Sequence, residues 1–475
     1  MVNTNNDKKT VATGVVLKSG IWYTVSNFAF RAIAFITTPI FSRVLSQSEY
    51  GEYNNINSWV SILVVLAACD LHSSIIRAKL DFEEDLESYS FSVLTLSSII
   101  TALFYLVFLL NGSLLENWLG VDKKYFHIIF LYILFNEVFY TFITLERAHY
   151  RYKSFSLLTG ISIVITSLFS VLLVLILNNK LDARVYGQYI PAIVIGIFMY
   201  LLIMYRGKHV RIKYYKYAIV LSLPLVPHQL SLILLSSSDR IMITKLSGAE
   251  YTALYSIAYI ITNIIAILLD SMNKAWAPWL LDSLKAKQFK TIKKTTTIYF
   301  MLFVVLIIGA LFFAPEAIMI LGGRNYIEAV YVLPPLIIGC LFQFTYTMYV
   351  QLEFYEKKMK TVAIGTAIAA VINIVLNYLL IPIFGYVAAG YTTLIGYGVL
   401  FIIHYITICR YGYKNIFDRK IIFSVLLIAI AVTPLVEILY SHNSIRYVLG
   451  GLYLLLIAGG AIKYGKNIIS LLKKK

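Results

Sequence analysis

Charged residues are scarce in this chain: they make up 14% of its 475 residues, against about a quarter in an ordinary soluble domain. Cysteine is scarcer, and Cys69, Cys340 and Cys409 form no CxxC pair, which argues against a disulfide framework or a zinc site. No Gly-x-x-x-x-Gly-Lys-Ser/Thr loop occurs, so nothing indicates ATP-driven chemistry. We expect no metal, cofactor or catalytic group. Hydrophobic residues instead reach 59%, which indicates an integral membrane protein, because charge is costly in hydrocarbon.

Apolar runs long enough to cross a bilayer recur along the whole chain. A spanning helix needs about 20 mostly apolar residues, and on this measure the sequence predicts an all-α integral membrane protein with about 14 transmembrane helices. The loops are too short to hold a soluble catalytic domain, so we expect a transporter rather than an enzyme. The predicted spans are 19–44, 55–77, 89–111, 125–146, 155–177, 187–205, 217–243, 252–280, 295–314, 329–353, 361–381, 386–409, 420–440 and 446–464.

The basic residues are distributed unequally between the two sides of the membrane that these spans define. Of the 41 Lys and Arg residues, 30 fall in one set of alternate loops and tails and 8 in the other set. This split is typical of the positive-inside rule and predicts that both termini are cytoplasmic. The net charge of +17 therefore indicates topology, and we expect no nucleic-acid partner.

A short internal repeat suggests two similar halves. The motif Leu-Ser-x-x-Glu-Tyr occurs at 45–50 and again at 246–251, an offset of 201 residues, each time after a predicted span. A weaker echo joins Tyr186-Gly187 to Phe384-Gly385. Each motif recurs six spans later, which predicts two six-helix lobes related by a pseudo-two-fold axis along the membrane normal, an architecture suited to alternating access. The expected domains are a cytoplasmic tail 1–18, an N-lobe 19–205, a C-lobe 206–409, and two further helices with a basic tail at 410–475.

Four basic residues in or beside the spans are candidates for binding an anionic substrate. Arg31 lies in the middle of the first span and cannot lose its charge, so it needs either an anionic ligand or an internal carboxylate. Arg77 is also suited to reaching lipid headgroups. Lys274 follows Asp270 at i,i+4 spacing, which suits a self-neutralised pair. Arg240 adjoins Asp239, but neighbouring helix residues point about 100° apart, so each should meet a different helix.

Acidic residues within the spans are candidates for ion coupling. Glu137 lies near the middle of the fourth span, where it could exchange a proton or instead form a salt bridge. Asp70, close to His72, is a weaker relay candidate, and Asp239 and Asp270 complete the set. A separate feature is the double break made by Pro224 and Pro227, which with His228 is a candidate hinge, because proline removes helix hydrogen bonds.

Four segments resemble the bacterial polysaccharide flippases that move O-antigen or capsule repeat units, within the multidrug/oligosaccharidyl-lipid/polysaccharide exporter superfamily. The segments are Arg31 through Glu49-Tyr50-Gly51-Glu52-Tyr53, Leu223-Pro224 through Asp239-Arg240, Asn273-Lys274-Ala275-Trp276-Ala277-Pro278-Trp279, and Asn373 to Asn377 with Gly385-Tyr386 and Ala389-Gly390-Tyr391. Their order and spacing run from about residue 15 to 465.

The resemblance implies a transporter that turns undecaprenyl-pyrophosphate-linked oligosaccharide from the inner to the outer leaflet of the bacterial cytoplasmic membrane. It also implies a cationic cavity that includes Arg31 and Arg240, and the lipid-linked oligosaccharide, the bilayer and a polysaccharide polymerase as partners. The alternative is an ion-coupled multidrug-type exporter on a related fold. Such an exporter of organic cations would line its cavity with acids and aromatics.

Overall fold

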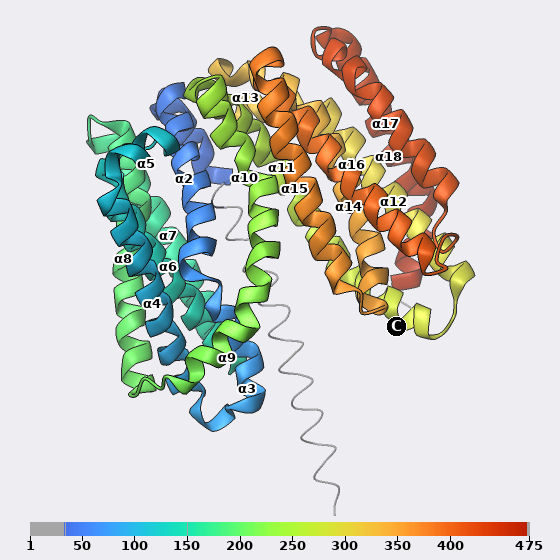
Figure 1. The fold of residues 1–475 in the computed structure, drawn as a ribbon. Helices are drawn as coiled ribbons and strands as arrows, with labels where there is room; N and C mark the ends of the chain where they lie inside the picture. The colour runs from blue at the N-terminus through green and yellow to red at the C-terminus, as the bar shows by residue number, and fades with distance from the viewer. Residues whose placement is uncertain (1–32, 34, 150, 473–475) are drawn as a thin grey trace, which may run out of the picture. The chain divides into compact units, whose positions relative to one another are not determined.

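The computed structural model describes residues 33, 35–149 and 151–472, and Figure 1 shows helices joined by short connections. In these ranges the chain has a helical stretch at 35–44, followed by 17 α-helices and five 3-10 helices, and no strand. The elements are α2 (Gln47–Ala68), η1 (Leu71–Ser74), α3 (Ile75–Asp81), η2 (Glu83–Asp85), α4 (Leu86–Leu110), α5 (Gly112–Leu119), η3 (Lys123–Tyr125), α6 (Phe126–Ala148), α7 (Tyr152–Ile176), α8 (Lys180–Gly207), α9 (Lys213–Ser222), η4 (Leu223–Leu225), α10 (Val226–Leu246), α11 (Ala249–Lys285), α12 (Phe289–Phe312), α13 (Ala314–Leu321), η5 (Arg324–Val332), α14 (Leu333–Tyr355), α15 (Met359–Phe384), α16 (Val387–Arg410), α17 (Arg419–Tyr440) and α18 (Asn443–Leu472).

The all-α membrane fold is confirmed. Among the described residues, 11 helices are long and apolar enough to cross a membrane, and 12 if a bent pair counts as one span. Each predicted span from 55–77 onward coincides with one helix or one broken helix. The first predicted span, 19–44, lies outside the described residues except for its end, which is helical over 35–44.

The helices of the second half follow those of the first at a nearly constant distance. Helix α11 begins 202 residues after α2, α12 begins 203 after α4, and α13 begins 202 after α5. The offset grows to 207 for α14, α15 and α16 against α6, α7 and α8, because η5 has nine residues where η3 has three. The repeat predicted from the six-residue motif therefore extends through seven helical elements of each half, including the short helices α5 and α13, which the sequence did not predict.

The weaker sequence echo does not mark equivalent positions. Gly187 lies inside α8, where a Cβ atom would come within 2.6 Å of Ser170 Cα on α7, so it permits close helix packing. Gly385 instead lies between α15 and α16 with φ +67°, a conformation that side chains disfavour. The two glycines are kept for different physical reasons, so this part of the sequence argument was wrong.

The stronger motif forms a helix cap in its first copy. The Ser46 side chain accepts the backbone N–H of Glu49, and the Glu49 carboxylate accepts the backbone N–H of Ser46 at 2.8 Å. This capping box satisfies two amide groups that a helix start leaves unpaired. One turn later Gly51 lies against the backbone of Ala249 at the start of α11, so the two motif copies meet in space.

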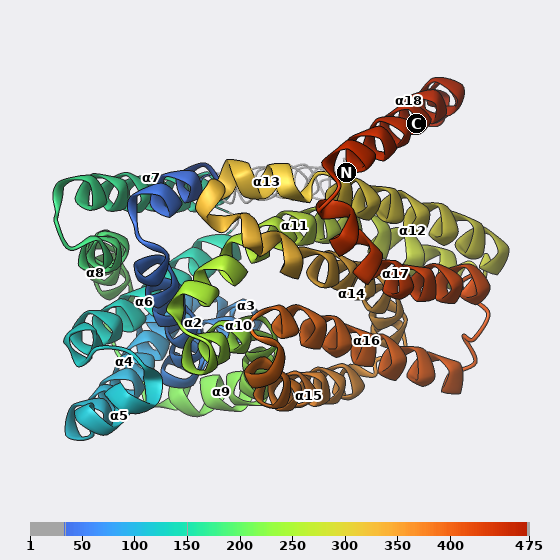
Figure 2. The same cartoon turned by 90° about the horizontal axis from the view of Figure 1, so that it is seen from above.

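Packing divides the chain into two compact units. Unit 1 comprises Met1–Ser256 and Thr366–Tyr386, and unit 2 comprises Ile257–Gly365 and Val387–Lys475. Helix α15 contributes its first turns to unit 2 and the remainder to unit 1. In unit 1, α4, α6 and α8 lie side by side (Figures 1 and 2), and buried residues of α2, α6 and α8 such as Ile56, Ile133 and Val185 form its core. The predicted lobes 19–205 and 206–409 stay a prediction.

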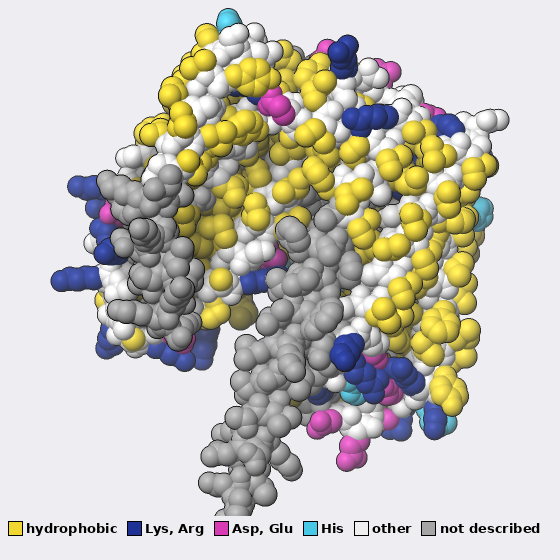
Figure 3. All heavy atoms as spheres, turned by 180° about the vertical axis from the view of Figure 1, so that it is seen from behind, with side chains coloured by type: hydrophobic (Ala, Val, Ile, Leu, Met, Phe, Trp, Pro, Cys, Tyr) yellow, Lys and Arg dark blue, Asp and Glu magenta, His cyan; other side chains and the backbone are white. Residues whose placement is uncertain are grey.

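Large apolar side chains are exposed along the lengths of the outer helices. Leu106 on α4, Leu172 on α7 and Leu427 on α17 are each more than half exposed. On the face drawn in Figure 3, hydrophobic side chains cover the length of the helices, and Lys and Arg gather near the helix ends. Such a surface suits a hydrocarbon solvent flanked by polar headgroups.

Candidate functional site

The second membrane-spanning segment is broken, where the sequence predicted one continuous helix over 55–77. Helix α2 ends at Ala68, and the chain resumes in η1 and α3 after a bend of 54°. Cys69 and Asp70 form the break with φ values of 53° and 50°. A non-glycine residue in this left-handed region costs about 1–3 kcal/mol, and such strain gathers at functional sites. The break therefore directs attention to Asp70 and its neighbours.

Glu137 of α6 lies directly at this break. Its Oε1 accepts the backbone N–H of His72 at 3.2 Å, one of the amide groups that the interruption leaves without a helical partner. The His72 ring lies against the same carboxylate, with Nδ1 3.1 Å from Oε2, and its Nε2 lies 3.2 Å from Asp70 Oδ1. Tyr140 stacks on the imidazole at 5.2 Å. Two carboxylates thus share one histidine, and Glu137 is only 1% exposed.

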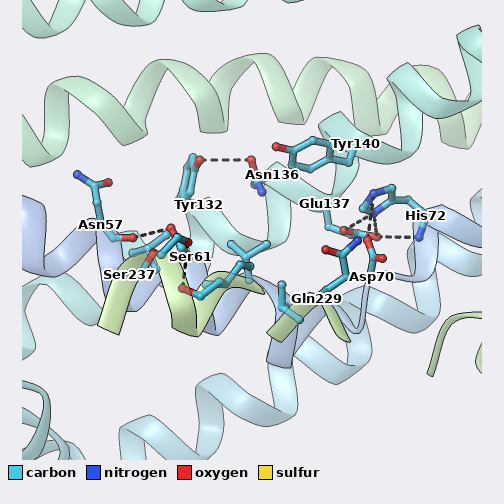
Figure 4. A pocket seen from close by; sticks show the side chains of 15 residues that line it. Asn57, Ser61, Asp70, His72, Tyr132, Asn136, Glu137, Tyr140, Gln229 and Ser237 are labelled. Carbon is cyan, nitrogen blue, oxygen red and sulfur yellow. Dashed lines mark hydrogen bonds and ion pairs between the residues drawn. The ribbon is translucent and has the colours of Figure 1, made fainter. Parts of the chain in front are cut away.

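This group forms one end of a cavity of about 450 Å³ in unit 1. Figure 4 shows side chains of α2, α6 and α10 converging on it, with His72, Glu137 and Asp70 together at one side and Asn57, Ser61 and Ser237 at the other. The remaining polar lining is amide, hydroxyl and phenol: Tyr132, Asn136, Tyr140, Gln229 and Ser236. Among the described lining residues there is no Lys or Arg. The cavity can therefore hydrogen-bond a hydroxyl-rich ligand and hold a proton, but its described lining offers no cation to an anion.

The polar lining was not identified from the sequence, although a signal was present. Asn57 and Ser61 are one helical turn apart on α2, and the Ser61 hydroxyl donates to the Asn57 backbone carbonyl at 2.8 Å. Tyr189 of α8 donates to the Asn57 side chain at 2.9 Å and fixes its orientation. Uncharged amides within spans are less costly than charges, so they stand out less in a sequence than interior Arg, Lys, Asp and Glu do.

Asp239 occupies a separate buried position in unit 1. Its side chain is fully buried, and it accepts hydrogen bonds from Tyr255 of α11 and, at 2.6 Å, from Asn377 of α15. Asn373, one turn before Asn377 on α15, accepts a hydrogen bond from the Ser238 hydroxyl of α10 at 3.3 Å. The expectation that Asp239 would bond a different helix is confirmed. The four polar groups tie α10 to α15, and the proposed ion-coupling role of Asp239 stays a prediction.

Arg240 points differently from its neighbour, as helix geometry requires. Its Nη1 donates to the Ser236 carbonyl at 3.1 Å, and its guanidinium lies 5.9 Å from the centre of the Tyr255 ring. Ser236 lines the cavity, so Arg240 lies one turn from it. Arg31, the other arginine expected in a cationic site, lies outside the described residues.

The remaining charged candidates form exposed pairs along single helices. Arg77 lies 3.5 Å from Asp81 and its side chain is 61% exposed. Lys274 lies 2.7 Å from Asp270, with side chains 58% and 51% exposed. Both are i,i+4 pairs, the structural alternative that the sequence offered for Lys274. Their roles in substrate binding and ion coupling stay predictions.

The double-proline segment interrupts helical hydrogen bonding as expected. Pro224 lies in the 3-10 turn η4 between α9 and α10, and Pro227 occupies the first turn of α10, a position where its missing N–H has no cost. His228 follows on the same turn. The break is present, and a hinge motion at Pro224, Pro227 and His228 stays a prediction.

Arg184 was assigned to a loop by the sequence analysis and instead lies inside α8. Its guanidinium lies between the rings of Phe41 and Tyr53, 3.8 and 4.1 Å from their centres, and donates to the Ser170 hydroxyl at 2.6 Å. Helix α8 begins at Lys180, seven residues before the predicted span, because the Asn179 side chain caps it through the N–H of Asp182. The polar first turns of α8 concealed the helix from a hydropathy criterion.

Comparison with known proteins decides the family. The family model described as "Polysaccharide biosynthesis protein" matches residues 16–284, more than half of the chain. The chain belongs to this family. A second model, MatE, matches residues 224–379. Protein 1 of the Lsg locus of Haemophilus influenzae is 21% identical over 382 residues, which cover 76% of this chain and 90% of that protein.

Solved structures show the same fold. Lipid II flippase MurJ, in an inward closed conformation, gives a TM-score of 0.73 at 14% identity, covering 94% of this chain and 100% of that one. An inward-facing multidrug resistance MATE family transporter of the MOP superfamily gives 0.59 at 14% identity, covering 83% and 98%. The resemblance noted in the sequence is confirmed at the level of family and fold: the chain is a member of the polysaccharide biosynthesis protein family with the fold of these membrane transporters.

Proposed function

We propose that this flippase translocates undecaprenyl-pyrophosphate-linked oligosaccharide, an O-antigen or capsule repeat unit, from the inner to the outer leaflet of the bacterial cytoplasmic membrane by alternating access. Both termini are cytoplasmic in this proposal, and a polysaccharide polymerase receives the product. Family membership supports the class of substrate. The 30-to-8 distribution of Lys and Arg supports the orientation.

The composition of the unit 1 cavity carries the proposal. Amide and hydroxyl side chains such as Asn57, Asn136 and Gln229 match the donor and acceptor pattern of sugar hydroxyls, and Tyr132 and Tyr140 offer aromatic faces for sugar rings. A volume of about 450 Å³ lies within the range of small-molecule sites, roughly 300–1,000 Å³. We assign this cavity to the sugars nearest the lipid.

The pyrophosphate needs cations, which the described cavity lining does not supply. Guanidinium groups bind phosphate oxygens in pairs, so arginines are the natural ligands. We keep Arg31 and Arg240 as the principal candidates, since Arg240 lies one turn from the cavity-lining Ser236. Arg77 and Lys274 are secondary candidates, because each already has a carboxylate partner.

The histidine with two carboxylates is suited to coupling transport to a proton. His72 changes charge near neutral pH in ordinary surroundings, and it contacts both Glu137 and Asp70. The contacts lie at a helix break, so a change of charge there acts on the backbone that joins α2 to α3. We propose that proton exchange at Glu137, His72 and Asp70 resets the cavity, with Asp239 as a second ion-coupling position and Asp270 as a weaker one.

One observation favours the multidrug-type alternative. The described cavity lining has two acids and two tyrosines and lacks Lys and Arg, which is the lining expected for organic cations. However, both acids contact His72. A cationic drug would have to displace the imidazole from Glu137, which is 1% exposed. The flippase assignment therefore accounts better for the arrangement.

Vesicles distinguish the two functions. The reconstituted full chain should move a fluorescent polyprenyl-pyrophosphate oligosaccharide between leaflets, scored by protection from an external glycosidase, and should not carry a fluorescent drug cation. The Arg31→Gln variant, with the same insertion as wild type, should lose this movement. Efflux of the drug cation with no movement of the lipid would establish the alternative function. Normal movement by Arg31→Gln would remove Arg31 from the site.

A further inference from the structure

Each half of the internal repeat carries a buried glutamate near the end of the same helix. Glu146 lies near the end of α6, and Glu353 lies at the corresponding position of α14, 207 residues later, the offset that relates these two helices. A leucine precedes each of them. Their side chains are 1% and 0% exposed. The repeat therefore places two ionisable groups in equivalent protected positions, neither of which belongs to the cavity described above.

The two glutamates have partners of different chemistry. Glu146 Oε1 accepts hydrogen bonds from Arg206 at 2.9 Å and from Arg151 at 3.2 Å. Glu353 Oε1 lies 2.7 Å from Nδ1 of His404 on α16, whose side chain is also fully buried. An arginine keeps its charge at any physiological pH, whereas a histidine is a cation only while it holds a proton. The arginines therefore balance the negative charge of Glu146 at every physiological pH. His404 balances the negative charge of Glu353 only while the histidine holds a proton.

The surroundings of the second pair isolate it from water. Tyr346 stacks on the His404 ring at 5.7 Å, and α15 approaches from another side at Gly365, where a Cβ atom would lie 3.5 Å from His404 Nε2. Within the described part of the chain, Glu353 Oε2 and His404 Nε2 are buried atoms with no hydrogen-bond partner. A buried polar atom normally has a partner, so a site with two exceptions is incomplete in this conformation.

Other charged groups on the surrounding elements are engaged elsewhere. Glu356, directly after α14, accepts from Tyr413 at 2.5 Å, Lys293 of α12 lies 3.1 Å from Asp418, and Arg419 of α17 bonds Tyr405. The backbone N–H of Lys358, before α15, donates to the Glu353 carbonyl at 2.8 Å. Across the described residues, no ion pair joins Arg410, Lys358 or any of the others to the His404 and Glu353 side chains.

We propose that Glu353 and His404 form a proton-binding site of unit 2, distinct from the His72 group in unit 1. With one proton the pair is neutral as a whole, the form that a low-dielectric interior favours. Loss of the proton leaves a carboxylate without a counter-charge, which requires water, so release accompanies opening of this end of α14 and α16. The proton passes to water, and the carboxylate is then solvated. The site does not depend on which substrate the transporter moves.

Proton release on unfolding tests the site with the full chain in detergent. At pH 8 in weakly buffered solution, an exposed histidine is neutral and an exposed glutamate is ionised, so unfolding must release the stored proton. Wild type should release about one proton per chain more than the Glu353→Gln/His404→Gln double variant. The Glu356→Gln variant, altered at a neighbouring acid that contacts Tyr413, should match wild type. Equal release by wild type and the double variant would overturn the proposal.

A second measurement needs no folded variant. The chain has seven histidines, so ¹⁵N-histidine spectra of wild type in lipid nanodiscs, combined with infrared spectra of protonated carboxyl groups, locate the proton directly. The expected result at neutral pH is an imidazolium signal from a histidine other than His72 that does not change with the pH of the solution, or a buried carboxylic acid band besides that of Glu137. Seven neutral or freely titrating histidines with no buried carboxylic acid would contradict the site.

Discussion

His72 and Glu137, 65 residues apart in the chain, meet through two different contacts. The Glu137 carboxylate accepts the His72 backbone N–H at 3.2 Å and lies 3.1 Å from the ring Nδ1. The first contact satisfies an amide that the helix break exposes, and the second depends on the ring's protonation. Glu137 thus has a structural role and a titratable role that single substitutions can separate.

Replacing Glu137 by Gln should preserve the fold and impair transport. Glutamine keeps an acceptor for the His72 N–H, but it cannot lose or gain a proton. We expect lipid translocation to fall roughly tenfold or more, and the remaining rate to lose its pH dependence. The measurement is the initial translocation rate in vesicles at several pH values. Glu84→Gln, at an exposed acid, is the matched control. An unchanged pH profile in Glu137→Gln would remove Glu137 from the coupling group.

Asp239 should respond more strongly to substitution than either donor that contacts it. In Asp239→Asn, one acceptor oxygen becomes an amide donor, which either faces the Asn377 amide N–H or requires the Tyr255 hydroxyl to turn and accept, so the variant should lose about 1–3 kcal/mol of stability. Tyr255→Phe removes one hydrogen bond and leaves the carboxylate bonded to Asn377, so it should cost less. Thermal unfolding of the purified variants measures both. Equal losses of stability in the two variants would contradict this prediction, because they would mean that the contact between Asp239 and Asn377 adds little.

Gly51 should tolerate no side chain. A Cβ atom there would lie 1.7 Å from the Ala249 carbonyl oxygen, a backbone atom that cannot rotate away. Gly51→Ala should therefore cost more than about 3 kcal/mol or abolish folded protein. Gly112→Ala, at the start of α5, meets nothing within 4 Å and should be neutral or stabilising. Yield and thermal unfolding check the pair, and similar behaviour of the two variants would contradict the contact between α2 and α11.

The link between α13 and α18 should weaken in acid. Hydrogen bonds from Arg446, at 2.6 and 2.7 Å, hold the pKa of the Glu316 carboxyl below its ordinary value. A lowered pKa stabilises the folded state above the ordinary value, and this stabilisation disappears as the pH falls through the lowered one. Glu316→Gln should therefore unfold at lower temperature than wild type at neutral pH, and the difference should close on acidification. A difference in unfolding temperature that persists in acid would mean that the substitution acts through packing and not through the charge of Glu316.

The sequence predicted membrane spans well, because length and hydropathy determine whether a helix crosses a bilayer. It did not predict the break at Cys69 and Asp70, since nothing at these positions resembles Pro or Gly. The strain there is compensated by Glu137, a contact from a distant helix. It also missed α5 and α13, which are only eight residues each and lie in apparent loops. Structural comparison of the two halves identifies them as one repeated feature.

For the candidate site, the sequence identified charges and could not assign their partners. Asp70, His72 and Glu137 were all singled out, but only folding brings α6 to the break. The pairing of Lys274 with Asp270, given as the alternative to a site role, is present because both residues lie on one helix at i,i+4 spacing. Arg184 was missed because its partners are aromatic rings and a hydroxyl. Local contacts follow from spacing, and contacts between helices do not.

The central claim is that this protein moves a lipid-linked oligosaccharide through a cavity whose state depends on Glu137. The most direct test measures leaflet exchange of a polyprenyl-pyrophosphate oligosaccharide in vesicles that contain equal amounts of correctly inserted wild type or Glu137→Gln protein. The account predicts fast exchange with wild type and a strongly reduced rate with the variant. No exchange above protein-free vesicles with wild type, or equal rates for the two proteins, would contradict it.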